Sequence, residues 1–326
     1  MGPQESSIRR VPSSGGPTAV TAPLAERGVG ARGVSVVIVN WNGGADLAEC
    51  VAALRQDIRG GVGEIVVVDN DSVDDSLDRL GNPPGVTTVR AGRNLGFAAG
   101  VNLGARFCNG RLLLLLNPDV RVLPGAIATA ADYLDGHSDV GIVGPVLVDG
   151  RGGWQPSAGR LGVLGHLVLD TRLARRPIRR TRSVGWIHGA FLLMPRTLFD
   201  QVGGLDEGYF MYGEDIDLCA RVRSAGYRTV VVAEARAVHY GNRSGALRWG
   251  DARDTEVVKG EMRFYAWAGR SWELGLFRVV AGLKFSMKGM LQALGGDYAA
   301  ARRTWQMASA CASFVPEPKT FRLHAG

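Results

Sequence analysis

The chain has 326 residues, of which 46% are hydrophobic and 21% charged, and its net charge is +7. This composition is typical of a globular protein of about one to two domains and excludes a disordered or fibrous chain. Its four cysteines form no Cys-x-x-Cys pair and have no accompanying His spacing, which argues against a zinc site or a disulfide framework and fits a reducing cytosol.

The first 32 residues mix Ser, Pro, Gly and Arg without periodicity and lack the apolar core of a secretion signal. We therefore expect residues 1–32 to be a disordered leader. No uncharged apolar stretch approaches the roughly 20 residues that span a bilayer, so we expect a cytoplasmic protein that does not cross a membrane. Six arginines between positions 172 and 182 could meet anionic headgroups or a diphosphate, or could form a solvated basic loop.

Three short apolar runs predict strands that are covered on both faces: residues 34–39, 64–68 and 111–116. Apolar residues at helical spacing lie between and after these runs, and they are Leu47, Val51, Leu54 and Ile58, then Val73, Leu77 and Leu80, then Leu123, Ile127 and Leu134. The order of strands and helices predicts an α/β fold with a mostly parallel sheet and right-handed crossovers.

Four polar clusters each come just after an apolar or β-branched run, where a buried strand should end. They are Asn40-Trp41-Asn42, Asp69-Asn70, Arg93-Asn94 and Asn117-Pro118-Asp119. The carboxyl ends of parallel strands share one edge of a sheet, so these clusters should meet in one crevice, where we place the active site. Asp69 could bind a base or a ribose, or could cap the next helix. Asp119 could hold a divalent cation, although Asn-Pro-Asp is also a common turn.

A second informative block runs from Gly208 to Arg221 and places Glu214 and Asp215 at the entrance of a predicted helix. The helix dipole favours negative charge there without any function, whereas the functional interpretation makes Asp215 a general base. Asp217 and Arg221, four residues apart, are expected to form a surface ion pair. Further on, His239 could join Asp119 on a metal ion, or could be a packed core histidine.

These motifs, together with Gly96-Phe97, Gly189-Ala190 and the segments around them, resemble the family 2 glycosyltransferases over about residues 34–245. Within that family they are most similar to the bacterial rhamnosyltransferase-like branch. The resemblance implies the GT-A fold, a Rossmann-like, mostly parallel sheet flanked by helices. It also implies a nucleotide-diphosphate-sugar donor and a Mg or Mn cation.

The resemblance also assigns roles by position. It makes Asp215 the catalytic base and Glu214 a residue that orients the acceptor or supports Asp215. It makes Asp119 and His239 the metal ligands, with Asn117 standing where relatives carry the first Asp of an Asp-x-Asp motif. The nucleotide-sugar site would comprise Asn40, Trp41, Asp69, Arg93, Asn94, Gly96 and Asn117. Independently of the resemblance, we expect the acceptor site at Trp186, His188 and Gly189, because indole faces suit the apolar faces of a sugar, although Trp186 and His188 could also pack in the core.

The expected reaction is an inverting transfer of a sugar to a hydroxyl of a saccharide acceptor, with rhamnose from dTDP-rhamnose as the first candidate donor. The acceptor would be a lipid-linked precursor of a cell-wall or surface polysaccharide, carried on a polyprenyl diphosphate. The alternatives are a UDP-sugar donor or a non-catalytic nucleotide-sugar-binding protein, which would have little need for Asp119 together with Glu214 and Asp215. A nucleic-acid-binding role is disfavoured because the basic residues are not interleaved with aromatic ones.

We expect a catalytic domain over residues 33–245 and a helical extension over residues 246–326. In the extension an apolar stripe recurs at spacings of 3 and 4 through Val280, Leu283, Met287, Met290 and Leu294, with Arg278, Lys284 and Lys288 to one side. This is a basic amphipathic pattern. Such a helix could lie on the inner face of the cell membrane, cover the catalytic domain, or form a homodimer.

Overall fold

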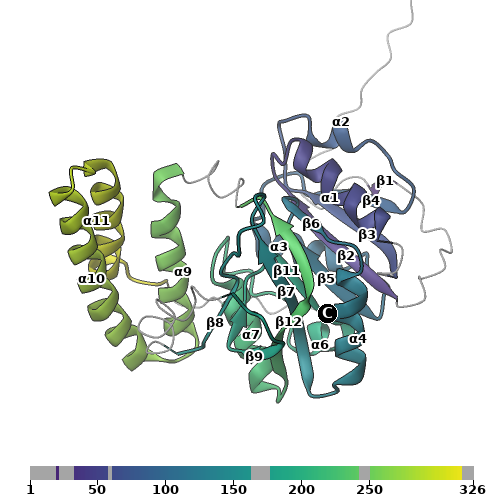
Figure 1. Cartoon of the computed structure of the whole chain (residues 1–326). Helices are drawn as coiled ribbons and strands as arrows, with labels where there is room; N and C mark the ends of the chain where they lie inside the picture. Colours follow the sequence, from purple (N-terminus) through teal and green to yellow (C-terminus); the bar gives the residue numbers. More distant parts are fainter. Residues whose placement is uncertain (1–19, 22–32, 58–60, 163–176, 242–249, 318–326) are drawn as a thin grey trace, which may run out of the picture.

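The computed structural model describes residues 20–21, 33–57, 61–162, 177–241 and 250–317. Within them, a twisted central sheet is flanked by helices on both faces, and three further helices stand to one side of it (Figure 1). Ten strands of the described chain form this sheet. In spatial order they are β1 (Val20–Thr21), β4 (Val86–Arg90), β3 (Val62–Asp69), β2 (Val34–Asn40), β5 (Leu112–Leu116), β11 (Phe191–Pro195), β7 (Val140–Val148), β12 (Arg228–His239) and β6 (Val120–Val122), with β9 (Arg182–Val184) also paired to β12.

Strands β2 and β5 are buried along their whole length, as the apolar runs predict. Side chains alternate between two hydrophobic cores because successive residues of a strand point to opposite faces. Val36 and Ile38 pack on one side with α1 (Ala45–Gln56) and α4 (Ala126–Gly136). Val37 and Val39 pack on the other with α3 (Phe97–Ala105) and α7 (Glu214–Ser224). The prediction of a sheet covered on both faces is confirmed.

The sheet is parallel from β4 to β5 and then reverses at β11, which runs antiparallel to both β5 and β7. Phe191 pairs with Leu116, and the Asn117 N–H donates to the Ala190 carbonyl over 3.0 Å. This reversal brings the Gly189-Ala190 segment to the edge where the parallel strands end. A small second sheet, β8 (Ala158–Gly159) with β10 (Trp186–Ile187), lies beside that edge and leads into it.

Two helical expectations differ in detail, and a third is not tested. The second helix, α2, spans only Ser76–Leu80, and Val73 lies before it with 88% of its surface exposed. Leu123 likewise precedes α4. Ile58 lies outside the described residues. For Val73 and Leu123, spacing alone overestimates helix length, because a residue in the preceding loop can match the helical period by chance.

Two residues of the expected leader, Val20 and Thr21, pair antiparallel with Val89 and Thr88 as strand β1. This differs from the expectation that the leader has no regular structure. The pairing adds an edge strand beside β4, where backbone donors and acceptors are available for another strand.

The helical extension consists of α9 (Arg253–Trp267), α10 (Ser271–Leu294) and α11 (Tyr298–Ser313), with a short turn of 3-10 helix at Gly250–Ala252 before it. Helices α10 and α11 pair closely, and α9 stands between them and α7 (Figure 1). A third core joins the four helices through Ile216, Met262, Phe277 and Cys311. No helix in the described part of the chain is long and apolar enough to cross a bilayer.

Candidate active site

A cavity of about 350 Å³ opens at the edge where β2, β3 and β5 end. This volume lies in the range of small-molecule sites. Most of the site residues expected from the sequence meet on its wall. They are Trp41, Asn94, Gly96, Asn117, Asp119, Trp186, His188, Gly189, Glu214 and Asp215.

Asp119 and His239 form a buried pair at this cavity. Antiparallel pairing of β6 with β12 sets His239 opposite Val120, which places the histidine beside Asp119. Nε2 of His239 lies 3.4 Å from Oδ1 of Asp119, and the exposed fraction of each residue is only 5%. Asp119 lines the cavity and His239 supports it from behind.

The protonation of His239 indicates what this pair can hold. Nδ1 of His239 lies 2.9 Å from Oε1 of Gln155, and because an amide oxygen only accepts, Nδ1 is the donor. In the neutral ring the lone pair of Nε2 then faces the Asp119 carboxylate, and Nε2 has no hydrogen-bond partner among the described residues. A cation satisfies two acceptors this close: a proton on Nε2 would make them an ion pair, and a divalent metal ion would take the same nitrogen and oxygen as ligands.

His188 lies near both Asp215 and the Asp119–His239 pair. Its Nδ1 accepts the Ala190 N–H over 3.2 Å, so the neutral ring carries its proton on Nε2. Burial lowers the pKa of His188, and the negative charges of Asp215 and Asp119 oppose that effect. The ring also lies 5.7 Å from that of His239, measured between centroids. His188 therefore provides a neutral N–H donor in the region between the two carboxylates.

Glu214 and Asp215 open helix α7, and Gly213 before them has φ 99° and occupies the N-cap. Oδ2 of Asp215 accepts the Gly189 N–H over 2.9 Å and Oδ1 accepts the Ile216 N–H over 2.8 Å. These two bonds fix the orientation of the carboxylate at the cavity. Burial raises the pKa of Glu214 to about 8, and the charge of Asp215 adds to the effect. Burial therefore favours the protonated, neutral form of Glu214 at pH 7.

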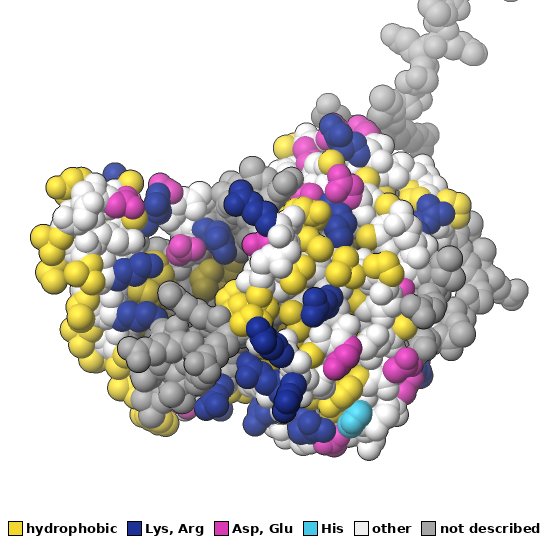
Figure 2. Space-filling view, viewed as in Figure 1, with side chains coloured by type: hydrophobic (Ala, Val, Ile, Leu, Met, Phe, Trp, Pro, Cys, Tyr) yellow, Lys and Arg dark blue, Asp and Glu magenta, His cyan; other side chains and the backbone are white. Residues whose placement is uncertain are grey.

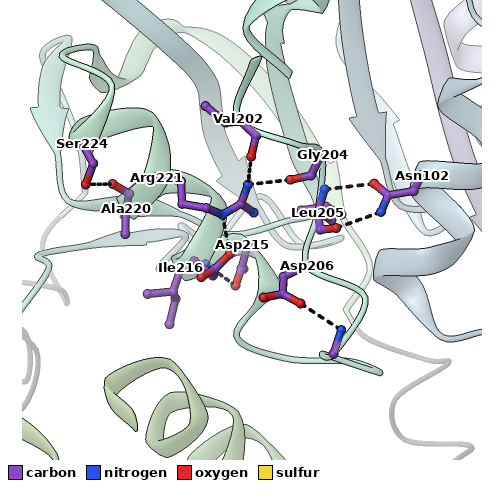
Figure 3. A network of polar contacts seen from close by, with 12 residues as sticks. Asn102, Val202, Gly204, Leu205, Asp206, Asp215, Ile216, Ala220, Arg221 and Ser224 are labelled. Atoms are coloured by element: carbon purple, nitrogen blue, oxygen red, sulfur yellow. Dashed lines mark hydrogen bonds and ion pairs between the residues drawn. The ribbon is translucent and has the colours of Figure 1, made fainter. Parts of the chain in front are cut away.

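A network around Arg221 fixes the loop that precedes α7 (Figure 3). The guanidinium binds Asp217 through Nε over 2.7 Å and donates through Nη1 to the carbonyls of Val202 and Gly204. Asn102 of α3 holds the same loop through two hydrogen bonds with the backbone of Leu205. The ion pair expected between Asp217 and Arg221 is present, but the expectation that it lies on the surface is wrong, because Asp217 is only 6% exposed.

Four expected site residues are not on the cavity wall. Asn40 is fully buried and donates to Ser72 and Ser76 as well as approaching Asp69, so it holds the segment after β3 in place. Asp69 is 2% exposed and has Arg90 at 3.9 Å. Arg93 is exposed and does not line the cavity, and His239 does not line the cavity either. Asn40 therefore has a structural role: its side chain holds neighbouring segments together by hydrogen bonds and is not accessible to a ligand.

The cavity wall also contains residues that the sequence analysis missed. Met211 and Tyr212 come from the loop before Glu214, whose aromatic and glycine content was the available signal. Arg253, Val257 and Glu261 come from α9, beyond the expected domain boundary at residue 245. Their spacing of four places them on one face of the helix, but only packing shows where that face points.

Close packing of backbones holds α9 against the site. A Cβ on Gly260 would lie 2.4 Å from the carbonyl oxygen of Tyr212, which is closer than real Cβ atoms approach. Gly213 faces Gly260 in the same way, since its added Cβ would lie 2.9 Å from the Gly260 carbonyl oxygen. These two glycines let α9 pack directly on the backbone that leads into Glu214.

The fold and this paired arrangement of carboxylates are those of a nucleotide-sugar transferase. Residues 31–254 match the model of the family described as glycosyltransferase like family 2, so the chain belongs to the family 2 glycosyltransferases. The resemblance expected from the sequence motifs is confirmed.

Two relatives of similar sequence agree with this family assignment. The N-acetylglucosaminyl-diphospho-decaprenol L-rhamnosyltransferase of Mycobacterium tuberculosis is 32% identical over 231 residues, covering 63% of this chain and 75% of that protein. The rhamnosyltransferase WbbL of Escherichia coli is 40% identical over 88 residues, which cover 25% of this chain and 33% of that protein.

Solved structures show the same fold. The mannosyltransferase PcManGT from Pyrobaculum calidifontis, in complex with GDP-Man and Mn²⁺, has a TM-score of 0.55 and 17% identity, covering 90% of this chain and 91% of its own. GalNAc-T7 with UDP, GalNAc and Mn²⁺ has a TM-score of 0.52 and 19% identity, covering 73% of this chain and 50% of that one. The GT-A fold expected from the sequence is thereby confirmed.

Proposed function

We propose that the chain is a metal-dependent, inverting glycosyltransferase that moves a sugar from a nucleoside diphosphate to a hydroxyl of a saccharide. The observation that carries this proposal is that Asp119 and Asp215 line one cavity, with the neutral His188 influenced by both charges. A cation site and a base on one cavity provide what a displacement at an anomeric carbon requires.

In the proposed reaction Asp215 accepts the proton of the acceptor hydroxyl. The hydroxyl oxygen bonds to the anomeric carbon from the side opposite the nucleoside diphosphate, and the bond from that carbon to the phosphate oxygen breaks. The configuration at the carbon therefore inverts, and the nucleoside diphosphate leaves with the bond's electron pair. The two backbone N–H groups that hold Asp215 keep its carboxylate aimed at the cavity while the proton moves.

Asp119 and His239 would hold a Mg²⁺ or Mn²⁺ ion, which when bound neutralises charge on the diphosphate. Two protein ligands leave the remaining positions to phosphate oxygens and water, as is usual for these ions in phosphate sites. The Mn²⁺ in both structural neighbours supports this cofactor class. Neutral Glu214 adds no second negative charge beside Asp215 and can donate a hydrogen bond to the acceptor.

For the substrates we propose rhamnose, with dTDP-rhamnose as the first candidate donor and UDP-sugars as the alternative. We propose as acceptor a saccharide carried on a polyprenyl diphosphate, the precursor of a cell-wall or surface polysaccharide. This follows from the mycobacterial relative, whose name specifies a decaprenol-linked acceptor and an L-rhamnosyl group. Trp41 and Asn94 on the cavity wall are the proposed nucleoside contacts, and Trp186 the proposed contact of the acceptor sugar.

The test is a panel of dTDP-, UDP- and GDP-sugars assayed for nucleoside diphosphate release, with and without Mg²⁺ or Mn²⁺, on a polyprenyl-diphosphate-linked N-acetylglucosamine acceptor. We expect release only with the acceptor and a divalent ion present, and an anomeric configuration in the product opposite to that of the donor by NMR. Retention of configuration would overturn the proposed displacement. Donor binding without transfer, on any acceptor, would favour a non-catalytic binding protein.

A further inference from the structure

Helix α10 exposes one continuous apolar face to the surroundings. Six of its large side chains share this face and are more than half exposed, and we refer to them as the outer face: Trp272, Val279, Leu283, Met287, Met290 and Leu294. Their steps of 7, 4, 4, 3 and 4 follow the period of an α-helix, so they form one stripe about 33 Å long at 1.5 Å per residue. Figure 2 shows hydrophobic side chains along the outer edge of the α10 and α11 pair.

The exposure of the outer face does not result from poor packing of α10 against its neighbours. The opposite side of α10 is well buried, since Phe277 and Ala281 are fully enclosed in a core with Met262 of α9 and Cys311 of α11. The helix therefore already has the apolar contacts that fix its position. No part of the described chain covers the outer face, and a contiguous exposed apolar surface of this kind marks an interaction site.

The charges beside the outer face are basic. Lys284 and Lys288, each one residue after an outer-face residue, are exposed along one long edge of it. Residues 271–313 contain five Lys or Arg and two Asp or Glu. Both acids are used locally, because Glu273 is paired with Arg270 and Asp297 caps α11. Arg278, expected in the basic edge, instead donates to the carbonyls of Cys311 and Phe314.

We propose that the outer face of α10 docks on an anionic lipid surface, with Lys284 and Lys288 at the headgroups and Trp272 at the interface. An apolar stripe with two lysines to one side and no acidic side chain of its own is complementary to such a surface. The same pattern disfavours a second copy, because a two-fold pairing through this face would bring like charges together without compensation. The helix lies along the surface, since it is not apolar enough to span a bilayer.

The docking would serve catalysis only if the acceptor is lipid-linked, as proposed above. Docking on a membrane does not itself depend on the acceptor. Helix α9 joins the two sites, because it carries Arg253 and Glu261 on the cavity wall and packs against α10 through its other side. A protein held by α10 would therefore keep its cavity at a fixed position relative to the surface that displays the acceptor.

The test measures flotation of the full chain with vesicles of phosphatidylcholine alone or mixed with phosphatidylglycerol. We expect binding only to the anionic vesicles. The double variant Leu283→Glu with Met287→Glu should bind at least roughly tenfold more weakly, and Lys284→Ala with Lys288→Ala roughly tenfold more weakly at low salt, with little difference left at high salt. The control is Val73→Glu, which changes an apolar side chain elsewhere that is even more exposed, and it should bind as the wild type does.

Unchanged vesicle binding by Leu283→Glu with Met287→Glu would overturn the proposal, as would equal binding of the wild type to neutral and anionic vesicles. A dimer in solution that the same variant dissociates would assign the face to a second copy instead. Circular dichroism and thermal melting confirm that the variants fold. Transfer to a water-soluble acceptor should be unchanged in the variant, so that loss of docking is distinguished from failure of the proposed transferase activity.

Discussion

The Gly189 N–H donates a hydrogen bond to Oδ2 of Asp215, and the Ile216 N–H donates to the other carboxylate oxygen. Gly189 lies beside β11 and Asp215 begins α7, so this bond joins the two halves of the site. It defines the direction in which the carboxylate faces the cavity. Each oxygen of Asp215 accepts one of the two bonds, whereas the NH₂ group of an asparagine in its place could not accept either.

Asp215→Asn should abolish most transfer and leave donor binding nearly unchanged. The amide cannot accept a proton from the acceptor hydroxyl, and loss of a general base costs about 10²- to 10⁴-fold in rate. Its NH₂ group also faces a backbone N–H, so we expect the variant to lose about 1–2 kcal/mol of stability. The measurements are nucleoside diphosphate release, donor titration calorimetry and thermal melting. Asp200→Asn, in an exposed ion pair with Arg196, is the control. Equal rates for Asp215→Asn and wild type would exclude Asp215 as the base.

Asp119→Asn and His239→Ala should weaken Mn²⁺-dependent binding of a nucleoside diphosphate by roughly tenfold to a hundredfold. Asp119→Asn removes the negative charge of one proposed ligand, and His239→Ala removes the other, whose Nε2 lies 3.4 Å from Oδ1 of Asp119. Binding without metal should change little, which calorimetry with and without Mn²⁺ will show. His137→Ala, which changes a histidine stacked on Tyr133 in α4, should have no effect on Mn²⁺ binding. If His239→Ala binds Mn²⁺ as the wild type does, the histidine only packs against Asp119.

Glu214 should make the protein less stable as the pH rises from about 4.5 to about 8. In this range the folded protein keeps the proton on Glu214, since burial raises its pKa to about 8, whereas the unfolded chain has released it. The native state then binds more protons, so the free energy of unfolding falls with rising pH, by at most about 1.4 kcal/mol per pH unit.

Glu214→Gln removes this titration. Its stability relative to the wild type should therefore be higher at pH 8 than at pH 5, as measured by urea unfolding at both values. The comparison between the two proteins cancels the contributions of other acids. Parallel pH profiles for the two proteins would show that Glu214 is ionised in the folded state at neutral pH.

Arg221→Ala should destabilise the protein by about 3 kcal/mol, because it leaves Asp217 nearly buried and unpaired. The carbonyls of Val202 and Gly204 lose the same donor, so the loop before α7 should loosen and transfer should fall with it. Urea unfolding and transfer rates measure the two effects. The matched control is Arg79→Ala, which breaks an Arg–Asp pair of the same spacing whose side chains are each 54% exposed. A similar small loss in both variants would mean that the Arg221 network contributes little.

Gly260→Ala should lower transfer by displacing α9 from the Tyr212 backbone, where an added Cβ would lie 2.4 Å from the carbonyl oxygen. The displacement moves Arg253 and Glu261 on the cavity wall. Gly275→Ala is the control, because it lies inside α10 with no atom within 4 Å of the added Cβ. That change should stabilise the protein by up to about 1 kcal/mol, as Ala is the better helix former. Thermal melting and transfer rates of both variants make the comparison.

The sequence by itself determined the parallel half of the sheet, the family and a set of candidate site residues. The signals used were local in the sequence. Continuous apolar runs identified β2 and β5, and the polar clusters that follow these runs identified Trp41 and Asp119. Both signals depend on neighbours in the chain, and a buried strand imposes them wherever it occurs.

Tertiary structure decided which of those polar residues reach the cavity, and the physical reason is that burial and orientation depend on packing between distant segments. Asn40 and Trp41 are adjacent in sequence. The side chain of Asn40 donates hydrogen bonds to Ser72 and Ser76 in the protein interior, whereas Trp41 lines the cavity. Helix α9 joins the site only because Gly213 and Gly260 allow its backbone to approach. No local pattern encodes a contact between residues nearly fifty positions apart, so its existence follows from the fold alone.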